Sequence, residues 1–308
     1  MRLPDDCTLT PTQYRQVRYE AERALLESGA KGVLPTPMDA IMAAANVTEV
    51  KEDVLNPQFI AQLRREAGKV GDVLKRALSK VLGIFHAPSG LVFLDQTLMK
   101  VKKRFVGFHE SGHGFMPWQR AMYSHIEDSE ASLEASAAEL FDREANVFAS
   151  EVMFQGDTFQ NLANDCKFGI FTPVNLAKKF GASTYSAIRQ YVSKNHRSCA
   201  VVVLNMPEYA EEVGFVATLR RSVQSTSFTN AFGENRWASS FTPDDPLGTI
   251  VPLKGNRASR PRTITLEDMN HEPTQCIAEA FTNTYQVFIL IHAVKTLTET
   301  KIILNSRG

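Results

Sequence analysis

The sequence predicts an α+β fold: a helical N-terminal region, a small β-sheet beside a helix carrying H-E-x-x-H, a helix-turn-helix-like segment and a mixed α/β C-terminal domain. Three observations predict it. Capped helical segments fill the first 80 residues, two short apolar runs lie between residues 83 and 95, and β-rich segments follow residue 196. A chain of 308 residues is long enough for about two domains.

Helix start signals recur in the N-terminal region. Either Thr10 or Thr12 can cap a helix through YRQVRYEAERALLESG, which Gly29 would end. In LPTPMDAIMAAA, Thr36 is the expected N-cap, with Pro37 at the first helical position. We expect a third helix over residues 56–82.

Strands and further helices follow. GIFHAPSGLVFLD reads as two short strands around a turn, and the second could be an edge strand that pairs with an extended peptide. The H-E-x-x-H helix should end near Pro117. SLEASAAELFDREANVFASEVMF, free of Gly and Pro, predicts a long helix over 132–154. Residues 173–195 read as helix, turn at 181–183, helix.

Beyond residue 196 the pattern changes to β. The expected strands are CAVVVL, VGFVATL, GTIVPL, RTITL and QVFILIHAV, separated by turn-rich segments.

Composition excludes few functions. The 34 basic and 34 acidic side chains balance, so bulk charge requires neither nucleic acid nor an anionic membrane. The four cysteines include no C-x-x-C pair, which favours a reducing compartment. No leader-like start and no run of about 18 apolar residues is present, so we expect a cytoplasmic protein without a membrane span.

The stretch FVGFHESGHGF contains a candidate metal site. His109 and His113 are four residues apart, so on a helix both imidazoles lie on one face and can bind one ion. Glu110 between them is placed to act as a base toward a water at that ion. The extended H-E-x-x-H-x-x-G-x-x-H pattern fails, because Met116 and Gln119 stand where Gly and His are required.

The third ligand must therefore come from a later element, and the next long helix offers several carboxylates. Asp142 is preferred because Asn146 follows one turn later on the same face, where it can orient a metal-bound histidine. Small residues around Asp142 would also let a second helix approach closely. Glu144 is the reserve ligand.

These residues resemble the ImmA/IrrE family of zinc metallopeptidases. The resemblance covers roughly residues 34–197: the strand LVFLD, then FHESGH, then DREANVFASEVM, and the helix-turn-helix-like NLAKKFGASTYSAIRQYV. Family members are gluzincin-like and carry Glu where this chain has Asp142. We therefore expect a zincin-like metallopeptidase domain over 1–155, a helix-turn-helix-like segment over 156–197 and a mixed α/β domain over 198–308. The resemblance does not extend clearly beyond about residue 200. Some family members carry a GAF-like sensory domain there, and a partner-docking module is the other expectation for this region.

The resemblance also implies an activity. This activity is that of a zinc endopeptidase that cleaves a helix-turn-helix transcriptional repressor and so derepresses a phage, mobile-element or stress regulon. Zn²⁺ would be held by His109, His113 and Asp142, with Glu110 as general base. Tyr123 and His125 follow the site closely and are candidate oxyanion donors.

The alternative is a DNA-binding or ligand-sensing transcriptional regulator whose zinc site is structural or degenerate. Basic residues cluster on and after the helix pair: Lys178, Lys179, Arg189, Lys194 and Arg197. The neutral net charge weighs against DNA binding, because the same lysines suit a solvated helix face.

Overall fold

The structure is a computed structural model that describes residues 8–50, 83–86, 91–94, 98–122, 135–234, 237–255 and 257–294. The helix expected over 56–82 lies outside these residues. The chain divides into two compact units: residues 1–165 with 175–187, and residues 166–174 with 188–308. Among the described helices, none combines the length and the apolar character needed to cross a membrane.

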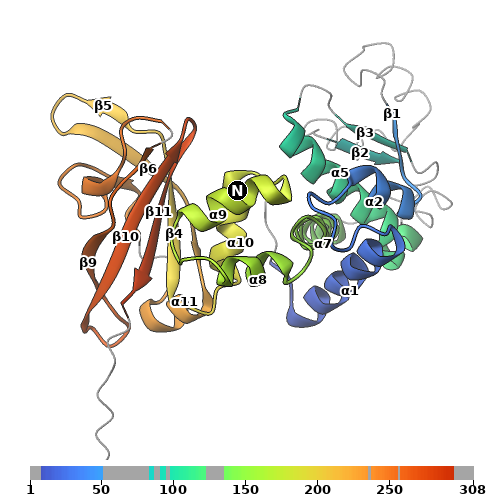
Figure 1. Ribbon diagram of the computed structural model, residues 1–308, viewed down its shortest axis with the longest axis horizontal. Helices are drawn as coiled ribbons and strands as arrows, with labels where there is room; N and C mark the ends of the chain where they lie inside the picture. Colours follow the sequence, from blue (N-terminus) through green and yellow to red (C-terminus); the bar gives the residue numbers. More distant parts are fainter. Residues whose placement is uncertain are drawn as a thin grey trace, which may run out of the picture. The chain divides into compact units, whose positions relative to one another are not determined.

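The first unit consists of helices and a small β-sheet (Figure 1). Its elements are α1 (Pro11–Glu27), α2 (Met38–Ala44), β1 (Thr48–Val50), β2 (Gly83–His86), β3 (Leu91–Leu94), α5 (Lys100–Phe115), α7 (Ala135–Phe154) and α8 (Thr158–Asn164). Both α9 (Phe171–Phe180) and α10 (Thr184–Ser193) have residues in each unit. The expected helix, turn, helix over 173–195 is therefore present.

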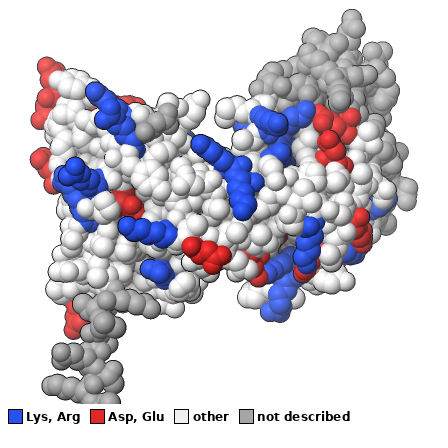
Figure 2. Space-filling model, viewed as in Figure 1, with Lys and Arg blue, Asp and Glu red and all other residues white. Residues whose placement is uncertain are grey.

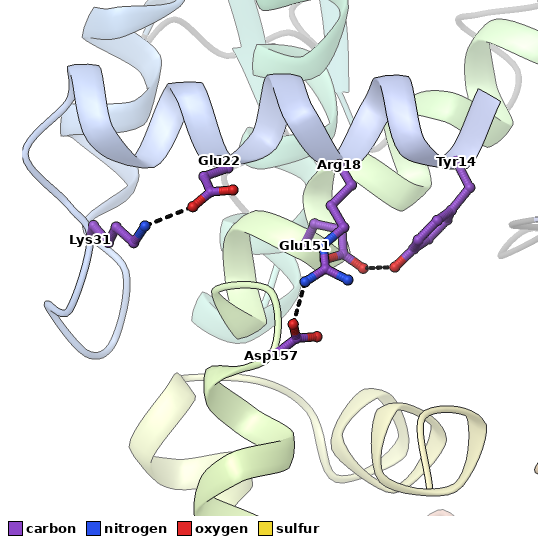
Figure 3. Close-up of polar contacts among 6 residues, drawn as sticks. All are labelled: Tyr14, Arg18, Glu22, Lys31, Glu151 and Asp157. Carbon is purple, nitrogen blue, oxygen red and sulfur yellow. Dashed lines mark hydrogen bonds and ion pairs between the residues drawn. The ribbon is translucent and has the colours of Figure 1, made fainter. Parts of the chain in front are cut away.

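Thr10, rather than Thr12, caps α1. Its hydroxyl accepts from the Gln13 backbone N–H, while the Gln13 side chain accepts from the Thr10 N–H, which completes a capping box. Polar contacts then join α1 to the end of α7 (Figure 3). The Tyr14 hydroxyl donates to the buried Glu151, and Arg18 pairs with Asp157 in the following turn.

Thr36 is not an N-cap, which corrects the sequence expectation. α2 begins at Met38 with Pro37 as its N-cap, and no side chain bonds to its first turn. The fully buried Thr36 hydroxyl instead donates to the Val152 carbonyl and accepts from the Gln155 amide, both at 3.0 Å. The hydroxyl is used to join the loop to α7, a long-range contact that local spacing does not reveal.

The small sheet has the order β1-β3-β2, so β3 is its central strand. β3 pairs in parallel with β1, from Thr48 with Leu91 onward, and antiparallel with β2 on its other side. Its backbone groups are thus used on both sides. The prediction that Leu91–Leu94 is an edge strand free to pair with a peptide is wrong, because a distant segment, β1, occupies that edge.

α5 and α7 pack closely because small residues lie between them. Ala145 and Ala149 on α7 are fully buried. A methyl group added at Gly112 of α5 would lie 3.0 Å from Cδ1 of Phe148 on α7. This close approach brings a histidine-bearing helix against a carboxylate-bearing one.

The second unit is built on a large antiparallel sheet, coloured from yellow to red in Figure 1. Its path is β5-β6-β4-β11-β10-β8, with β7 beside β6 and β9 beside β10. The elements are β4 (Cys199–Asn205), β5 (Glu208–Ala210), β6 (Gly214–Gln224), α11 (Thr226–Phe232), β7 (Ser240–Phe241), the 3₁₀ helix η2 (Gly248–Ile250), β8 (Arg257–Ala258), β9 (Arg262–Glu267), β10 (Pro273–Asn283) and β11 (Gln286–Ala293).

The centre of this sheet is buried on both faces, which explains the nearly continuous apolar runs of β4 and β11. On one face Val202, Ile289 and Ala280 lie side by side in register. Phe228 and Phe232 of α11 pack against this core, with their rings stacked 4.5 Å apart. The second unit therefore has a core of its own.

The sequence predicted one strand wrongly in this unit and did not predict another. GTIVPL is not a strand: Gly248–Ile250 is a 3₁₀ helix, and the Gly248 α-carbon lies so close to the Thr242 carbonyl that no side chain fits. β10 was not expected, because its buried positions are small residues such as Ala278 and Ala280, which carry little β signal. The α+β fold class itself is confirmed.

Candidate metal centre

α5 holds both histidines, and packing rather than local propensity makes this segment helical. KVKKRFVGFHESGHGF contains three glycines and places basic residues at its N-terminus, where the helix dipole disfavours them. Fully buried Phe108 and largely buried Phe115 fix the helix in the unit. His109 and His113 consequently lie one turn apart, with their rings edge to face at 4.9 Å.

The helices bring His109, His113 and Asp142 together. One potential ligand atom from each residue lies within 4.8 Å of the others, and Asp142 is the most exposed of the three. Within the part of the chain that the structure describes, these three side chains form a group compact enough to hold a metal ion.

The two imidazoles face each other through Nε2, at 3.2 Å. His109 Nδ1 lies 3.1 Å from Asn146 Oδ1, and His113 Nδ1 lies 2.6 Å from Gln119 Oε1. Each Nδ1 then donates its hydrogen to an amide oxygen, which leaves a lone pair on each Nε2. Two lone pairs facing each other repel, and a cation between them removes the repulsion.

The residues fit a zinc ion. With Zn–N bonds of about 2.05 Å, two ligands of a tetrahedral site are about 3.3 Å apart, close to the separation of the two Nε2 atoms. Two imidazole nitrogens and one carboxylate form the donor set of zinc sites that keep a position open for water.

Burial sets the protonation states of these side chains. It lowers the pKa of His109 to about 3, with help from the neighbouring His113, and it also lowers the pKa of His113. Both imidazoles are thereby kept neutral, the form that binds metals. Burial, followed by the charge of Asp142, raises the pKa of Glu110 to about 8.

Glu144, the reserve ligand, lies outside this group. Its Oε2 accepts hydrogen bonds from Trp118 Nε1 at 2.8 Å and from Gln119 Nε2 at 2.6 Å. Tyr123 and His125, the candidate oxyanion donors, lie outside the described residues. Sequence spacing gave no role to Gln119, which stands where the extended motif requires its third histidine.

Comparisons with known proteins give two findings. Residues 66–190 match the model of the IrrE N-terminal-like domain, a family of M78 peptidases. The fold resembles a solved structure described as a Mycobacterium tuberculosis transcriptional regulator, with a TM-score of 0.50 and 12% identity over 91% of this chain and 76% of that one. No curated protein matches the chain significantly.

The matched residues include the whole of α5 and α7 and most of the helix pair after them. The likeness to the solved structure concerns the fold alone, given its low sequence identity. The family match covers the strand, the H-E-x-x-H helix and the DREAN segment that carry the resemblance in sequence. The match over residues 66–190 therefore supports the resemblance to the ImmA/IrrE family that the sequence shows.

Proposed function

We propose that this chain is a zinc-dependent endopeptidase that cleaves a protein substrate. The observation that carries the proposal is the pair of Nε2 atoms, 3.2 Å apart and beside Asp142. In this proposal His109, His113 and Asp142 hold the zinc ion. When bound, zinc lowers the pKa of a water in its open position and polarises the substrate carbonyl.

Glu110 is the proposed general base. Its carboxylate takes a proton from the attacking water as the water oxygen bonds to the scissile carbonyl carbon. The same carboxyl then gives that proton to the amide nitrogen as the C–N bond breaks.

The proposed substrate is a helix-turn-helix transcriptional repressor, whose cleavage derepresses a phage, mobile-element or stress regulon. The family resemblance supports this substrate. The likeness in fold to a protein described as a transcriptional regulator is compatible with a role in gene control.

Metal content tests the first part of the proposal. Purified wild type should carry one zinc per chain by elemental analysis, and His113→Ala and Asp142→Ala should lose it. Glu139→Ala, an exposed acidic position one turn before Asp142 on α7, is the matched control and should keep it. Wild type that stays metal-free after zinc is supplied overturns the proposal.

Cleavage tests the second part. Zinc-loaded wild type, incubated with helix-turn-helix repressors of the same genome, should generate new N-termini that mass spectrometry detects. Glu110→Gln should bind zinc normally and produce none, a loss of at least about 100-fold for a missing general base. Equal cleavage by Glu110→Gln removes Glu110 from the mechanism.

A DNA-binding regulator remains the second candidate, and the helix pair gives it little support. A recognition helix inserts an exposed face into the major groove. Every residue of α10 before Ser193 is buried or half-buried. On the face drawn in Figure 2, Lys and Arg also lie among Asp and Glu. The absence of a salt-dependent gel shift with duplex DNA would eliminate this candidate.

A further inference from the structure

We propose that Gln119 and Glu144 are positioning residues that fix the tautomer of His113. They would hold the Nδ1–H form, whose Nε2 keeps the lone pair that binds the metal. The inference rests on the proposed metal site and deepens it, because it gives Glu144 a role other than that of a ligand.

The orientation of the Gln119 amide follows from its neighbours. Its Nε2 lies 2.6 Å from the Glu144 carboxylate and 3.3 Å from the Phe141 carbonyl oxygen, and both of these groups only accept hydrogen bonds. The NH₂ end must therefore face them. The carbonyl end, Oε1, then faces His113 Nδ1 at 2.6 Å, so Nδ1 must carry the hydrogen.

Glu144 is the anchor of this chain of hydrogen bonds. One of its oxygens, Oε2, accepts from both Gln119 and the Trp118 indole N–H. The Glu144 residue is 4% exposed and Gln119 is 0% exposed, so water cannot easily replace either partner. A carboxylate here also repels the Gln119 carbonyl, which disfavours a flipped amide that would present NH₂ to His113.

The arrangement differs from that at His109. Asn146 lies on the same helix as Asp142, one turn later, and contacts His109 directly. Gln119 comes from the short helical segment after α5, so His113 depends on how that segment docks on α7. Two separate elements thus orient the two imidazoles, each through an amide oxygen.

The tautomer can be measured without metal. In the metal-free full chain at neutral pH, long-range ¹H–¹⁵N spectra of labelled imidazoles should show His113 protonated at Nδ1 only. In Gln119→Leu the acceptor is gone, and the Nε2–H tautomer should become populated. Wild type protonated at Nε2, or a variant spectrum identical to wild type, overturns the inference.

Metal affinity gives a second readout, by competition with a chromogenic chelator. Gln119→Leu and Glu144→Leu should each weaken Zn²⁺ binding roughly 10–100-fold. Glu144→Gln should stay within about threefold of wild type, because one amide oxygen can still accept from Trp118 and Gln119. A loss of binding in Glu144→Gln as large as in Asp142→Ala would make Glu144 a ligand and overturn the inference.

Gln155→Leu is the matched control. Gln155 is also buried, and it makes four hydrogen bonds in the same unit, to Gly32, Ala30, Val33 and Thr36. Its loss should lower the melting temperature and leave the zinc affinity of the folded protein unchanged. An equal loss of affinity in Gln155→Leu would mean that the effect of Gln119→Leu is general destabilisation, which also overturns the inference.

A swapped pair covers the case in which Gln119→Leu does not fold. In Gln119→Glu/Glu144→Gln, the new carboxylate accepts from His113 and from the new amide, so the Nδ1–H tautomer and zinc affinity should be kept. Loss of that tautomer overturns the inference. If wild type binds no metal but shows the expected tautomer and its dependence on Gln119, the proposed function fails and the positioning role of Gln119 stands.

Discussion

At the scale of single residues, two acidic side chains on α7 have different surroundings although they are two positions apart. Residues i and i+2 of an α-helix are rotated by about 200°, so Asp142 and Glu144 cannot point the same way. Asp142 lies beside the histidines, whereas Glu144 accepts from Trp118 and Gln119. Asn146, one turn after Asp142, shares the Asp142 side and contacts His109.

A buried carboxyl in the second unit gives a pH prediction. Glu279 of β10 accepts the Ile170 N–H at 2.8 Å, and burial raises its pKa above the usual value of 4.5. The folded state thus keeps this proton to higher pH than the unfolded state, so the contribution of Glu279 to stability falls as pH rises above about 4.5. Glu279→Gln removes that loss and keeps an acceptor for Ile170.

The melting temperature of Glu279→Gln minus that of wild type should therefore increase between pH 4.5 and pH 8. Thermal unfolding followed by circular dichroism measures this difference. The control is Glu208→Gln, at an exposed position of β5, where the difference should stay flat. A flat profile for Glu279→Gln as well would contradict a raised pKa.

At the scale of elements, the spacing of α5 and α7 depends on Gly112. A methyl group there would lie 3.0 Å from Cδ1 and 3.2 Å from Cγ of the fully buried Phe148, which also packs on Phe115. Because Phe148 is fully buried, we expect Gly112→Ala to push the helices apart. We expect a loss of stability of about 1–3 kcal/mol and weaker zinc binding, because the histidines would move away from Asp142.

Gly107→Ala is the matched control for this prediction. It also adds a methyl group to α5, but the methyl group would meet the flexible side chain of Met38 on α2. Zinc affinity, measured by chelator competition, should fall in Gly112→Ala and stay near that of wild type in Gly107→Ala. Equal affinities in both variants would show that helix spacing does not control the site.

At the scale of the whole molecule, the two units should respond differently to metal. The three candidate ligands all belong to the first unit, and the second unit has a separate core of strands and α11. A metal that binds only the folded state stabilises by about 4 kcal/mol when its free concentration is 1,000 times Kd. Chelation should therefore lower the melting transition of the first unit and leave that of the second unchanged.

Differential scanning calorimetry of the full chain, with chelator and after zinc is added back, measures these transitions. His113→Ala serves as the control, because its thermogram should not respond to chelator. A wild-type thermogram that chelator leaves unchanged would contradict a metal in the first unit. The two roles expected for residues 198–308, a sensory or a partner-docking domain, stay predictions.

The sequence by itself determined the local features. A cap located α1, the absence of Gly and Pro located α7, and a turn signal divided the helix pair. The H-E-x-x-H spacing predicted α5 and put two imidazoles on one helical face. Those features depend on residues within a few positions of one another. The α+β class and the family resemblance followed from the order of such segments along the chain.

Only the tertiary structure decided which distant groups meet. Sequence spacing did not reveal that β1 covers the edge of β3, that the Thr36 hydroxyl bonds to α7, or that Gln119 joins His113 to Glu144. Each of these contacts joins residues from different elements. Their partners are chosen by the packing of the whole unit, because burial requires each polar group to find whichever partner the fold brings within hydrogen-bonding distance.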